Sequence, residues 1–193
     1  MKGYFLMKHL IILCGASGTG KTTIQQYLKD KYQMPRVITH TTRKKRDNEI
    51  DGVDYYFETD KSFDQKHYFE SVNYDGKKYG SSQEALQEAW KKSDFATLVV
   101  DTPGAISYVK ALGNQVTVFH IQVSDLKELK KRLIKRGDNA ELVKQRLASK
   151  ESQRDLNVPI EIKQNTIIIH NDDWNLTKKK IDQAVQKIQQ KFQ

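Results

Sequence analysis

The chain has 193 residues, enough for one well-buried core with small inserted subdomains and too few for two large independent domains. Its 33 Lys and Arg residues against 24 Asp and Glu residues give a formal net charge of +9, which suits an anionic partner, either a nucleotide or a nucleic acid. The single cysteine, Cys14, excludes an internal disulfide and fits a packed thiol in a reducing cytosol. The five histidines show no metal-ligand spacing, so no transition-metal site is expected.

The N-terminal segment differs from a secretory signal in the length of its apolar run. Leu10 to Cys14 are consecutive apolar residues, fewer than the roughly 7 to 15 of a signal sequence, and no stretch approaches the ~18 to 20 apolar residues of a membrane span. We therefore expect a soluble, cytoplasmic protein that does not enter a membrane. Met1 to Leu6 are expected to be an optional extension, with Met7 as an alternative start.

A glycine-rich motif follows this first apolar run. Gly15 to Thr22 read Gly-Ala-Ser-Gly-Thr-Gly-Lys-Thr and match the pattern G-x-x-x-x-G-K-[ST] in full, with a helical pattern after them. Backbone N–H groups of such a loop, with the positive end of the next helix, can surround the β-phosphate of a nucleoside triphosphate. Lys21 would reach the β- and γ-phosphate oxygens, and Thr22 would ligate Mg²⁺. The alternative, a glycine turn that only joins two elements, needs no Lys-Thr pair.

Short apolar runs alternate with helical patterns along most of the chain. The runs are Leu10–Cys14, Val37–Thr39, Leu98–Asp101, Val116–Ile121 and Ile167–His170. This alternation predicts an α/β fold with a parallel core sheet flanked by helices. Ser81 and Glu84 have the spacing of a capping box, which predicts that a helix begins there.

The stretch from Thr41 to Gly80 breaks the alternation. Aromatic and polar residues alternate at 55–57 and 68–70, and Asp75-Gly76 is typical of a two-residue hairpin turn, so we expect a small antiparallel insertion. At its start, Arg43 and Arg46 lie three residues apart in a polar loop, where guanidinium groups can bind a phosphate in bidentate fashion. The alternative for this segment is a solvated basic run.

Asp101 follows the apolar run that begins at Leu98, the position from which an aspartate can sit beside Mg²⁺ in a nucleotide-binding fold. The alternative is that Asp101 caps the turn before Pro103-Gly104. The residue pattern alone leaves both interpretations open.

A second excursion, Leu129 to Lys150, is predicted to form two helices separated at Gly137. It contains Arg132, Arg136 and Arg146. Because Arg132 and Arg136 are four residues apart, both can face one anion from the same side of a helix.

In their order along the chain, these motifs resemble the guanylate kinase family. The resemblance extends from Leu10 to the closing helix, and no piece after the glycine loop is specific without the others. The matching segments, in addition to Gly15–Thr22, are Thr41–Arg46, Glu49–Tyr55, Phe69–Glu70, Tyr79–Ser81, Gly104–Ala105, Leu129–Gly137, Arg146–Leu147 and Asn171–Asp173.

The resemblance implies one three-part kinase domain over residues 1–193. The core would comprise residues 8–36, 82–125 and 154–193, the nucleoside monophosphate-binding insertion residues 37–81, and the mobile lid residues 126–153. The implied reaction transfers the γ-phosphoryl group of ATP to GMP or dGMP with Mg²⁺ as cofactor. We expect a monomer or weak homodimer with no membrane or nucleic-acid partner.

Site residues are also implied by the resemblance. The catalytic set is Lys21, Arg43, Arg132, Arg136 and Arg146. The ATP-binding set is Gly15, Ala16, Ser17, Gly18, Thr19, Gly20, Lys21, Thr22, Thr23 and Asn171. The GMP-binding set is Thr39, Arg43, Arg46, Tyr55, Glu70, Tyr79, Ser81 and Asp101, and the metal ligands are Thr22 and Asp101. Glu70 suits guanine, because a carboxylate can accept hydrogen bonds from both N1–H and the 2-amino group.

The chain departs from the family pattern at several positions. Val99 occupies the place of a family acid, Lys45 that of a proline, and Gln122-Val123 that of two prolines before the lid. These departures leave two alternatives, a P-loop kinase with a diverged acceptor and a catalytically weak guanylate-kinase-like binding module. The joint presence of Lys21, Thr22 and the lid arginines favours the enzyme.

Overall fold

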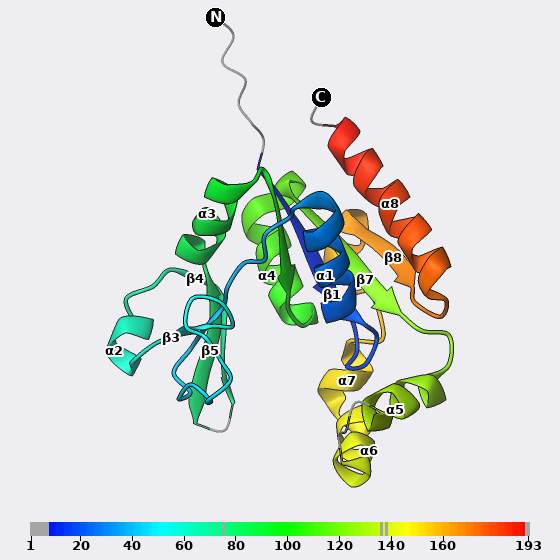
Figure 1. Cartoon of the computed structure of the whole chain (residues 1–193), viewed down its shortest axis with the longest axis horizontal. Coiled ribbons are helices and arrows are strands. Elements are labelled where there is room, and N and C mark those ends of the chain that lie inside the picture. Colours follow the sequence, from blue (N-terminus) through cyan, green and yellow to red (C-terminus); the bar gives the residue numbers. More distant parts are fainter. Residues whose placement is uncertain (1–7, 75, 136, 138, 192–193) are drawn as a thin grey trace, which may run out of the picture.

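The computed structural model describes residues 8–74, 76–135, 137 and 139–191 (Figure 1). A parallel core sheet has the strand order β6-β1-β7-β8. Its strands are β1 (His9–Cys14), β6 (Phe95–Val99), β7 (Val116–Gln122) and β8 (Thr166–His170). All six residues of β1 are buried, as expected for a central strand covered on both faces. Because the strands run in parallel, their carboxyl ends meet at one edge, where ligands bind in folds of this kind.

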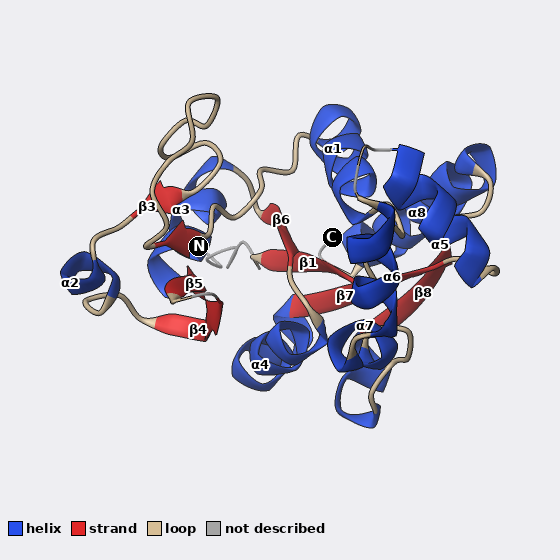
Figure 2. Cartoon of the chain, turned by 90° about the horizontal axis from the view of Figure 1, so that it is seen from below, coloured by secondary structure: helices blue, strands red, loops and turns tan. Residues whose placement is uncertain are grey.

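Helices cover both faces of this sheet, as Figure 2 shows for α1 and α8 on one side and α4 on the other. Alternate residues of β1 separate the two layers: Leu10 and Ile12 pack in the cluster that contains α3 and α4 residues, and Ile11 and Leu13 pack with α1 and α8. These helices are α1 (Lys21–Tyr32), α3 (Gln83–Lys92), α4 (Thr102–Leu112) and α8 (Trp174–Gln190). Short 3₁₀ helices occupy Gly113–Gln115 and Ile160–Asn165.

A second, separate sheet lies beside α3 and α4 of the core, with the strand order β3-β2-β5-β4 (Figure 1). Its strands are β2 (His40–Thr41), β3 (Tyr56–Phe57), β4 (Tyr68–Tyr74) and β5 (Lys77–Ser82), with the short helix α2 (Asp60–Phe63) beside them. The predicted antiparallel hairpin is present as β4–β5, but β2 and β3 pair in parallel, so this sheet is mixed. Of the predicted turn, Asp75 lies outside the described residues, and Gly76 has φ 68°.

Three helices follow β7 and lie beyond the carboxyl edge of the core sheet (Figure 1). They are α5 (Leu126–Lys135), α6 (Ala140–Ala148) and α7 (Lys150–Arg154). The buried face of α5 rests on the glycine-rich loop, where a Cβ atom on Gly18 would lie 3.1 Å from Leu133 Cγ. Gly137 follows α5 with φ 99°, consistent with the predicted helix stop.

Three local predictions are wrong. Residues Val37–Thr39 form no regular strand: the segment meets β6 through one bridge, between Arg36 and Thr97. The strand predicted to end at Asp101 ends at Val99, because the chain turns there into α4. The residue that caps α3 is Ser82 rather than Ser81, and its hydroxyl accepts a hydrogen bond from Ala85 N. Of the helices in the described ranges, none is long and apolar enough to cross a membrane.

Candidate active site

The glycine-rich loop connects β1 to α1 at the carboxyl edge of the core sheet. Gly15 and Gly20 have φ values of 126° and 100°, which L side chains rarely adopt. A Cβ atom would lie 2.3 Å from Ile121 O at Gly15 and 2.3 Å from Asn171 Nδ2 at Gly20, so both positions require glycine. Because Gly20 is the N-cap of α1 and has no side chain, the first N–H groups of the helix face the loop and can bind an anion.

Lys21 folds back over this loop. Its Nζ atom donates to Gly15 O at 2.6 Å and to Ala16 O at 2.8 Å. Lys21 also lines a cavity of about 540 Å³, which we call the donor cavity. The residues that line it are Ser17, Gly18, Gly20, Lys21, Thr22, Thr23, Arg132, Leu133 and Asn171. The structure thus gathers most of the predicted ATP-binding residues and one lid arginine around one cavity of ligand size.

Asn171 braces the loop. Its Nδ2 donates to Thr19 O at 2.8 Å, and its Oδ1 accepts from the hydroxyl of Thr177 at 3.1 Å. Its backbone N–H also bonds to Gln122 O at 2.8 Å. Asn171 is buried, so its position fixes the loop relative to β7 and α8.

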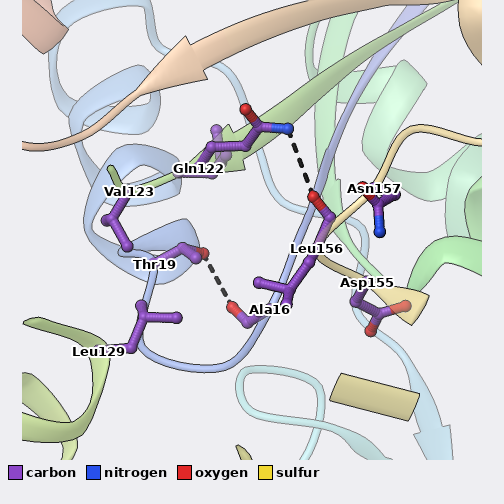
Figure 3. A pocket seen from close by; sticks show the side chains of 9 residues that line it. Ala16, Thr19, Gln122, Val123, Leu129, Asp155, Leu156 and Asn157 are labelled. Atoms are coloured by element: carbon purple, nitrogen blue, oxygen red, sulfur yellow. Dashed lines mark hydrogen bonds between the residues drawn. The ribbon is translucent and has the colours of Figure 1, made fainter. Parts of the chain in front are cut away.

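A second cavity of about 240 Å³ adjoins the loop (Figure 3). Predicted ATP-binding residues Ala16 and Thr19 line it, and the Thr19 hydroxyl donates to Ala16 O at 2.9 Å. Gln122 reaches across it, with Nε2 at 3.5 Å from Leu156 O, so the segment after α7 is tied to the end of β7. The remaining lining residues are Ile121, Val123, Leu129, Asp155 and Asn157.

Asp101 is the N-cap of α4. Its Oδ1 accepts from Gly104 N at 2.9 Å, and its Oδ2 accepts from Arg154 Nη2 at 3.1 Å. Arg154 Nε also donates to Asp155 Oδ1 at 2.9 Å, so one guanidinium bridges two carboxylates beside the loop. Burial raises the pKa of the Cys14 thiol to about 12, with Asp155 and Asp101 adding to the rise and Lys21 opposing it. Cys14 is therefore a packed, neutral thiol.

On the second sheet, Arg43 forms a bidentate pair with Glu49. The two N···O distances are 2.9 and 2.7 Å, and Arg46 N donates to the same carboxylate at 2.8 Å. The hydrogen bond from Arg43 is the main reason that the pKa of Glu49 falls to about 2. The Arg43 guanidinium lies 5.6 Å from the ring centre of Tyr55, and the rings of Tyr55 and Tyr79 are 6.3 Å apart. These predicted phosphate-binding residues therefore form one cluster, apart from Arg46, whose side chain is exposed.

Glu70 and Ser81 face each other across the β4–β5 hairpin. The buried Ser81 hydroxyl donates to Glu70 Oε1 at 2.8 Å. Burial raises the pKa of Glu70, the Ser81 hydroxyl opposes this, and the charge of Asp101 adds to the rise. The residue before Glu70, Phe69, packs against Tyr108 of α4 with 4.3 Å between the ring centres, so this part of β4 lies beside the core. Thr39 contributes a backbone contact in this region, with its carbonyl accepting from Tyr56 N at 2.9 Å.

The guanylate kinase family model matches residues 7–188 of the chain. The chain belongs to the guanylate kinase family. It is 33% identical to the guanylate kinase of Thermus thermophilus (78% of this chain, 69% of the relative) and 30% identical to that of Fusobacterium nucleatum (84% and 88%). It is also 33% identical to the Rickettsia typhi enzyme, covering 91% of this chain and 89% of the relative. The predicted family and the predicted kinase are confirmed.

A solved structure supports the fold of this family member. The crystal structure of guanylate kinase from Anaplasma phagocytophilum superimposes with a TM-score of 0.59 over 93% of this chain and 85% of that chain, at 21% sequence identity. The predicted α/β fold class is therefore confirmed.

The lid arginines predicted from the family pattern do not all lie at the donor cavity. Arg132 lines the donor cavity, and Arg146 lies exposed on α6. Arg136 lies outside the described residues. The described part of the lid therefore brings one arginine to the loop in this conformation.

Three residues of this family member escaped the sequence prediction. Glu49 begins the matching segment Glu49–Tyr55, but nothing in that pattern indicates that its carboxylate pairs with Arg43. Arg154 and Asp155 lie 53 and 54 positions beyond Asp101, and no charge pattern in the sequence singles them out. Arg154 and Asp155 can be identified only from the fold, which places the end of α7 beside the start of α4.

Proposed function

We propose that this protein transfers the γ-phosphoryl group of ATP to GMP, or to dGMP, releasing ADP and the nucleoside diphosphate. The observation that carries the proposal is the Glu70–Ser81 pair, a half-buried carboxylate hydrogen-bonded to a buried hydroxyl in a guanylate kinase family member. Ionised Glu70 can accept hydrogen bonds from N1–H and the 2-amino group of guanine, which adenine does not offer together.

On the donor side, the loop Gly15–Gly20 and the first turn of α1 would bind the β-phosphate as a P-loop, with Thr23 and Asn171 completing the ATP site. Lys21 would exchange the carbonyl groups of Gly15 and Ala16 for the β- and γ-phosphate oxygens. This exchange keeps the ammonium hydrogen-bonded in both states and aims its charge at the transferring group.

Mg²⁺ is the cofactor that this reaction class requires. Hydroxyl and carboxylate oxygens are its usual protein ligands, and Thr22 at the edge of the donor cavity would supply the first. Asp101 would supply the second if it released the contact that it makes with Arg154. The donor set therefore fits Mg²⁺, which when bound neutralises phosphate charge.

On the acceptor side, Arg43, Arg46, Tyr55 and Tyr79 would hold the phosphate of GMP. Glu49 keeps the Arg43 guanidinium oriented and hydrogen-bonded before the ligand arrives. The base would lie against Thr39, Glu70, Ser81 and Asp101.

Phosphoryl transfer requires the two sides to close over the substrates and exclude water. We propose that residues 37–81 and 126–153 move as acceptor-binding part and lid against a core of residues 8–36, 82–125 and 154–193. The motion would bring Arg132, Arg136 and Arg146 to the transferring group, whose charge they would neutralise without forming a covalent intermediate.

The proposal also includes the cellular compartment, the oligomeric state and the partners. The protein would work in the cytoplasm as a monomer or weak homodimer, without a nucleic-acid or membrane partner. A neutral, buried Cys14 as the single cysteine suits a reducing compartment.

The direct test is ADP release from ATP and Mg²⁺ with GMP, dGMP, AMP, CMP and UMP as acceptors. We expect turnover with GMP and dGMP and little with the others. Turnover with a different monophosphate would identify a kinase with a diverged acceptor. No ADP release with any of the five, together with GMP binding in calorimetry, would identify a binding module.

A further inference from the structure

The buried hydroxyl of Tyr108 donates no hydrogen bond to the described residues. The side chain belongs to α4 and is fully buried, and its oxygen meets no hydrogen-bond partner among the residues that the structure describes. A buried, unpaired hydroxyl is costly, so such groups call for an explanation. The ring of Tyr108 packs against that of Phe69 in a tilted arrangement, with 4.3 Å between the ring centres and an angle of 32° between the planes. This contact attaches α4 of the core to β4 of the second sheet, which lie side by side in Figures 1 and 2.

Geometry brings this side chain to the base-binding pair, because Tyr108 packs on Phe69, the residue before Glu70 on β4, and Glu70 pairs with Ser81 of β5. Burial raises the pKa of the Tyr108 phenol, the Ser81 hydroxyl partly offsets the rise, and the charge of Glu70 adds to it. Ser81 donates its single hydroxyl hydrogen to Glu70 Oε1, which leaves the lone pairs of Ser81 Oγ able to accept. A donor without an acceptor thus lies next to an acceptor with spare capacity.

We propose that Tyr108 is a positioning residue of the purine site, and that when the acceptor nucleotide is bound its hydroxyl donates to Ser81 Oγ. This inference rests on the proposed function and adds to it a specificity-determining residue. The resulting chain runs from Tyr108 O–H to Ser81 O–H to the Glu70 carboxylate. Each hydrogen bond polarises the next, so Tyr108 strengthens the bond that Ser81 makes to Glu70 without touching the ligand.

The chain acts on the charge of Glu70. The groups that influence the ionisation of Glu70 are Ser81 on β5 and Asp101 at the start of α4. The charge of Glu70 in turn raises the pKa of Tyr108 on α4. Burial and Asp101 favour the protonated carboxyl, and the hydroxyl chain favours the ionised one. Guanine recognition requires the ionised form. Binding of GMP is therefore lost as the pH falls through the raised pKa of Glu70, and removing the Tyr108 hydroxyl moves this loss to higher pH.

Tyr68 provides a matched control. Its hydroxyl is also buried and meets no partner within the described chain, and its ring stacks on Phe63 at 4.3 Å. The charges that influence its ionisation are those of Glu58, Glu84 and Asp64, not that of Glu70. Tyr68→Phe therefore makes the same chemical change at a buried hydroxyl of β4 that is not part of the Ser81–Glu70 hydrogen bond.

The experiment compares Tyr108→Phe with Tyr68→Phe in the full-length protein. Each variant should unfold at the wild-type temperature or above it, because each loses an unpaired buried hydroxyl. Tyr108→Phe should raise KM for GMP, and Kd for GMP in calorimetry, by about three- to tenfold, the range expected for one neutral hydrogen bond. Its kcat and its KM for ATP should stay at wild-type values, and the acid limb of kcat/KM for GMP should move to higher pH. Tyr68→Phe should change none of these.

Ser81→Ala separates positioning from packing. In that background Tyr108→Phe should have no further effect on GMP affinity, because the chain is already broken. Wild-type GMP affinity and an unmoved acid limb in Tyr108→Phe would overturn the inference, as would full additivity with Ser81→Ala. Failure of the proposed function is a separate result, since it is read from the wild-type protein: if another monophosphate is the acceptor, the same variants test Tyr108 with that nucleotide.

Discussion

The glycine-rich loop and the second sheet are held by different interactions. The loop follows a fully buried strand, and backbone geometry confines it: a Cβ on Gly15 or Gly20 would overlap a neighbour at 2.3 Å. In the second sheet, the Arg43–Glu49 ion pair and the aromatic rings around it hold the anion-binding groups, on a frame in which β2 and β3 have 2 residues each. The donor side is therefore organised by backbone geometry together with the side chains of Lys21 and Asn171, and the acceptor side by side-chain partners that a ligand can replace.

This difference has a functional consequence. A rigid loop can present its N–H groups to a phosphate without reorganising, so no reorganisation energy is lost when the phosphate charge is stabilised. Side chains that already satisfy one another can change partners when the acceptor arrives, which suits a part that has to close. Substitutions on the two sides should therefore affect the two substrates separately.

The largest effect is expected on the donor side. Lys21→Ala should lower kcat by at least about a hundredfold, because it removes the charge that follows the β- and γ-phosphate oxygens, while GMP affinity and the unfolding temperature stay near wild type. Lys29→Ala, an exposed change on the same helix, is the control. Steady-state kinetics with calorimetry for GMP measure both quantities. Turnover of Lys21→Ala within about tenfold of wild type would refute the role of Lys21.

Val99 lies on the core sheet and tests whether the missing family acid matters. It pairs with Leu13 and packs against the cluster that also contains Ile24 and Ile181. Val99→Asp should lower the free energy of unfolding by about 1–3 kcal/mol, because it places a half-buried carboxylate against apolar side chains, and it should not raise turnover. Denaturant unfolding of Val99→Asp and Val99→Ala separates charge from lost volume. Unchanged stability with faster, more Mg²⁺-dependent turnover would show instead that the strand end can accept a second metal-binding acid.

A smaller effect is expected on the acceptor side. Glu49→Gln should raise KM for GMP by roughly two- to tenfold and leave KM for ATP unchanged, because Arg43 loses a charged bidentate partner. The pKa of Glu49 is depressed from 4.5 to about 2, so its pairing with Arg43 is complete above the ordinary glutamate range and is lost as the pH falls through about 2. The rise in KM should therefore be equal at neutral and mildly acidic pH. Asp47→Asn in the same loop is the control, and an equal change in KM for ATP would contradict the separation of the two sides.

The features that could be predicted from the sequence are those encoded by neighbouring residues. The glycine-rich loop is contiguous, and its glycines meet a backbone requirement that the sequence motif itself indicates. The central strands are continuous apolar runs, and their parallel pairing follows from the helices between them. Even the hairpin at 68–82 was visible in its alternating residues and turn.

The features that could not be predicted depend on distant contacts or on register. Ser81 and Ser82 are both compatible with a helix cap, and the strand pairing decides between them: Ser81 meets Glu70, and Ser82 meets His40 and caps α3. Asp101 was compatible with a cap or a metal ligand, and its contact with Arg154 depends on the return of α7 to the core. The parallel β2–β3 pair is too short to leave a periodic pattern.

The central claim is that Glu70 selects guanine, and the kcat/KM values for GMP and AMP of Glu70→Gln test it most directly. Glutamine keeps the size of the side chain but presents a donor where guanine needs an acceptor. Loss of a charged hydrogen bond in a closed site costs about 1.5–3 kcal/mol, so kcat/KM for GMP should fall by at least roughly tenfold while AMP gains relative to GMP. An unchanged preference for GMP over AMP would contradict the account.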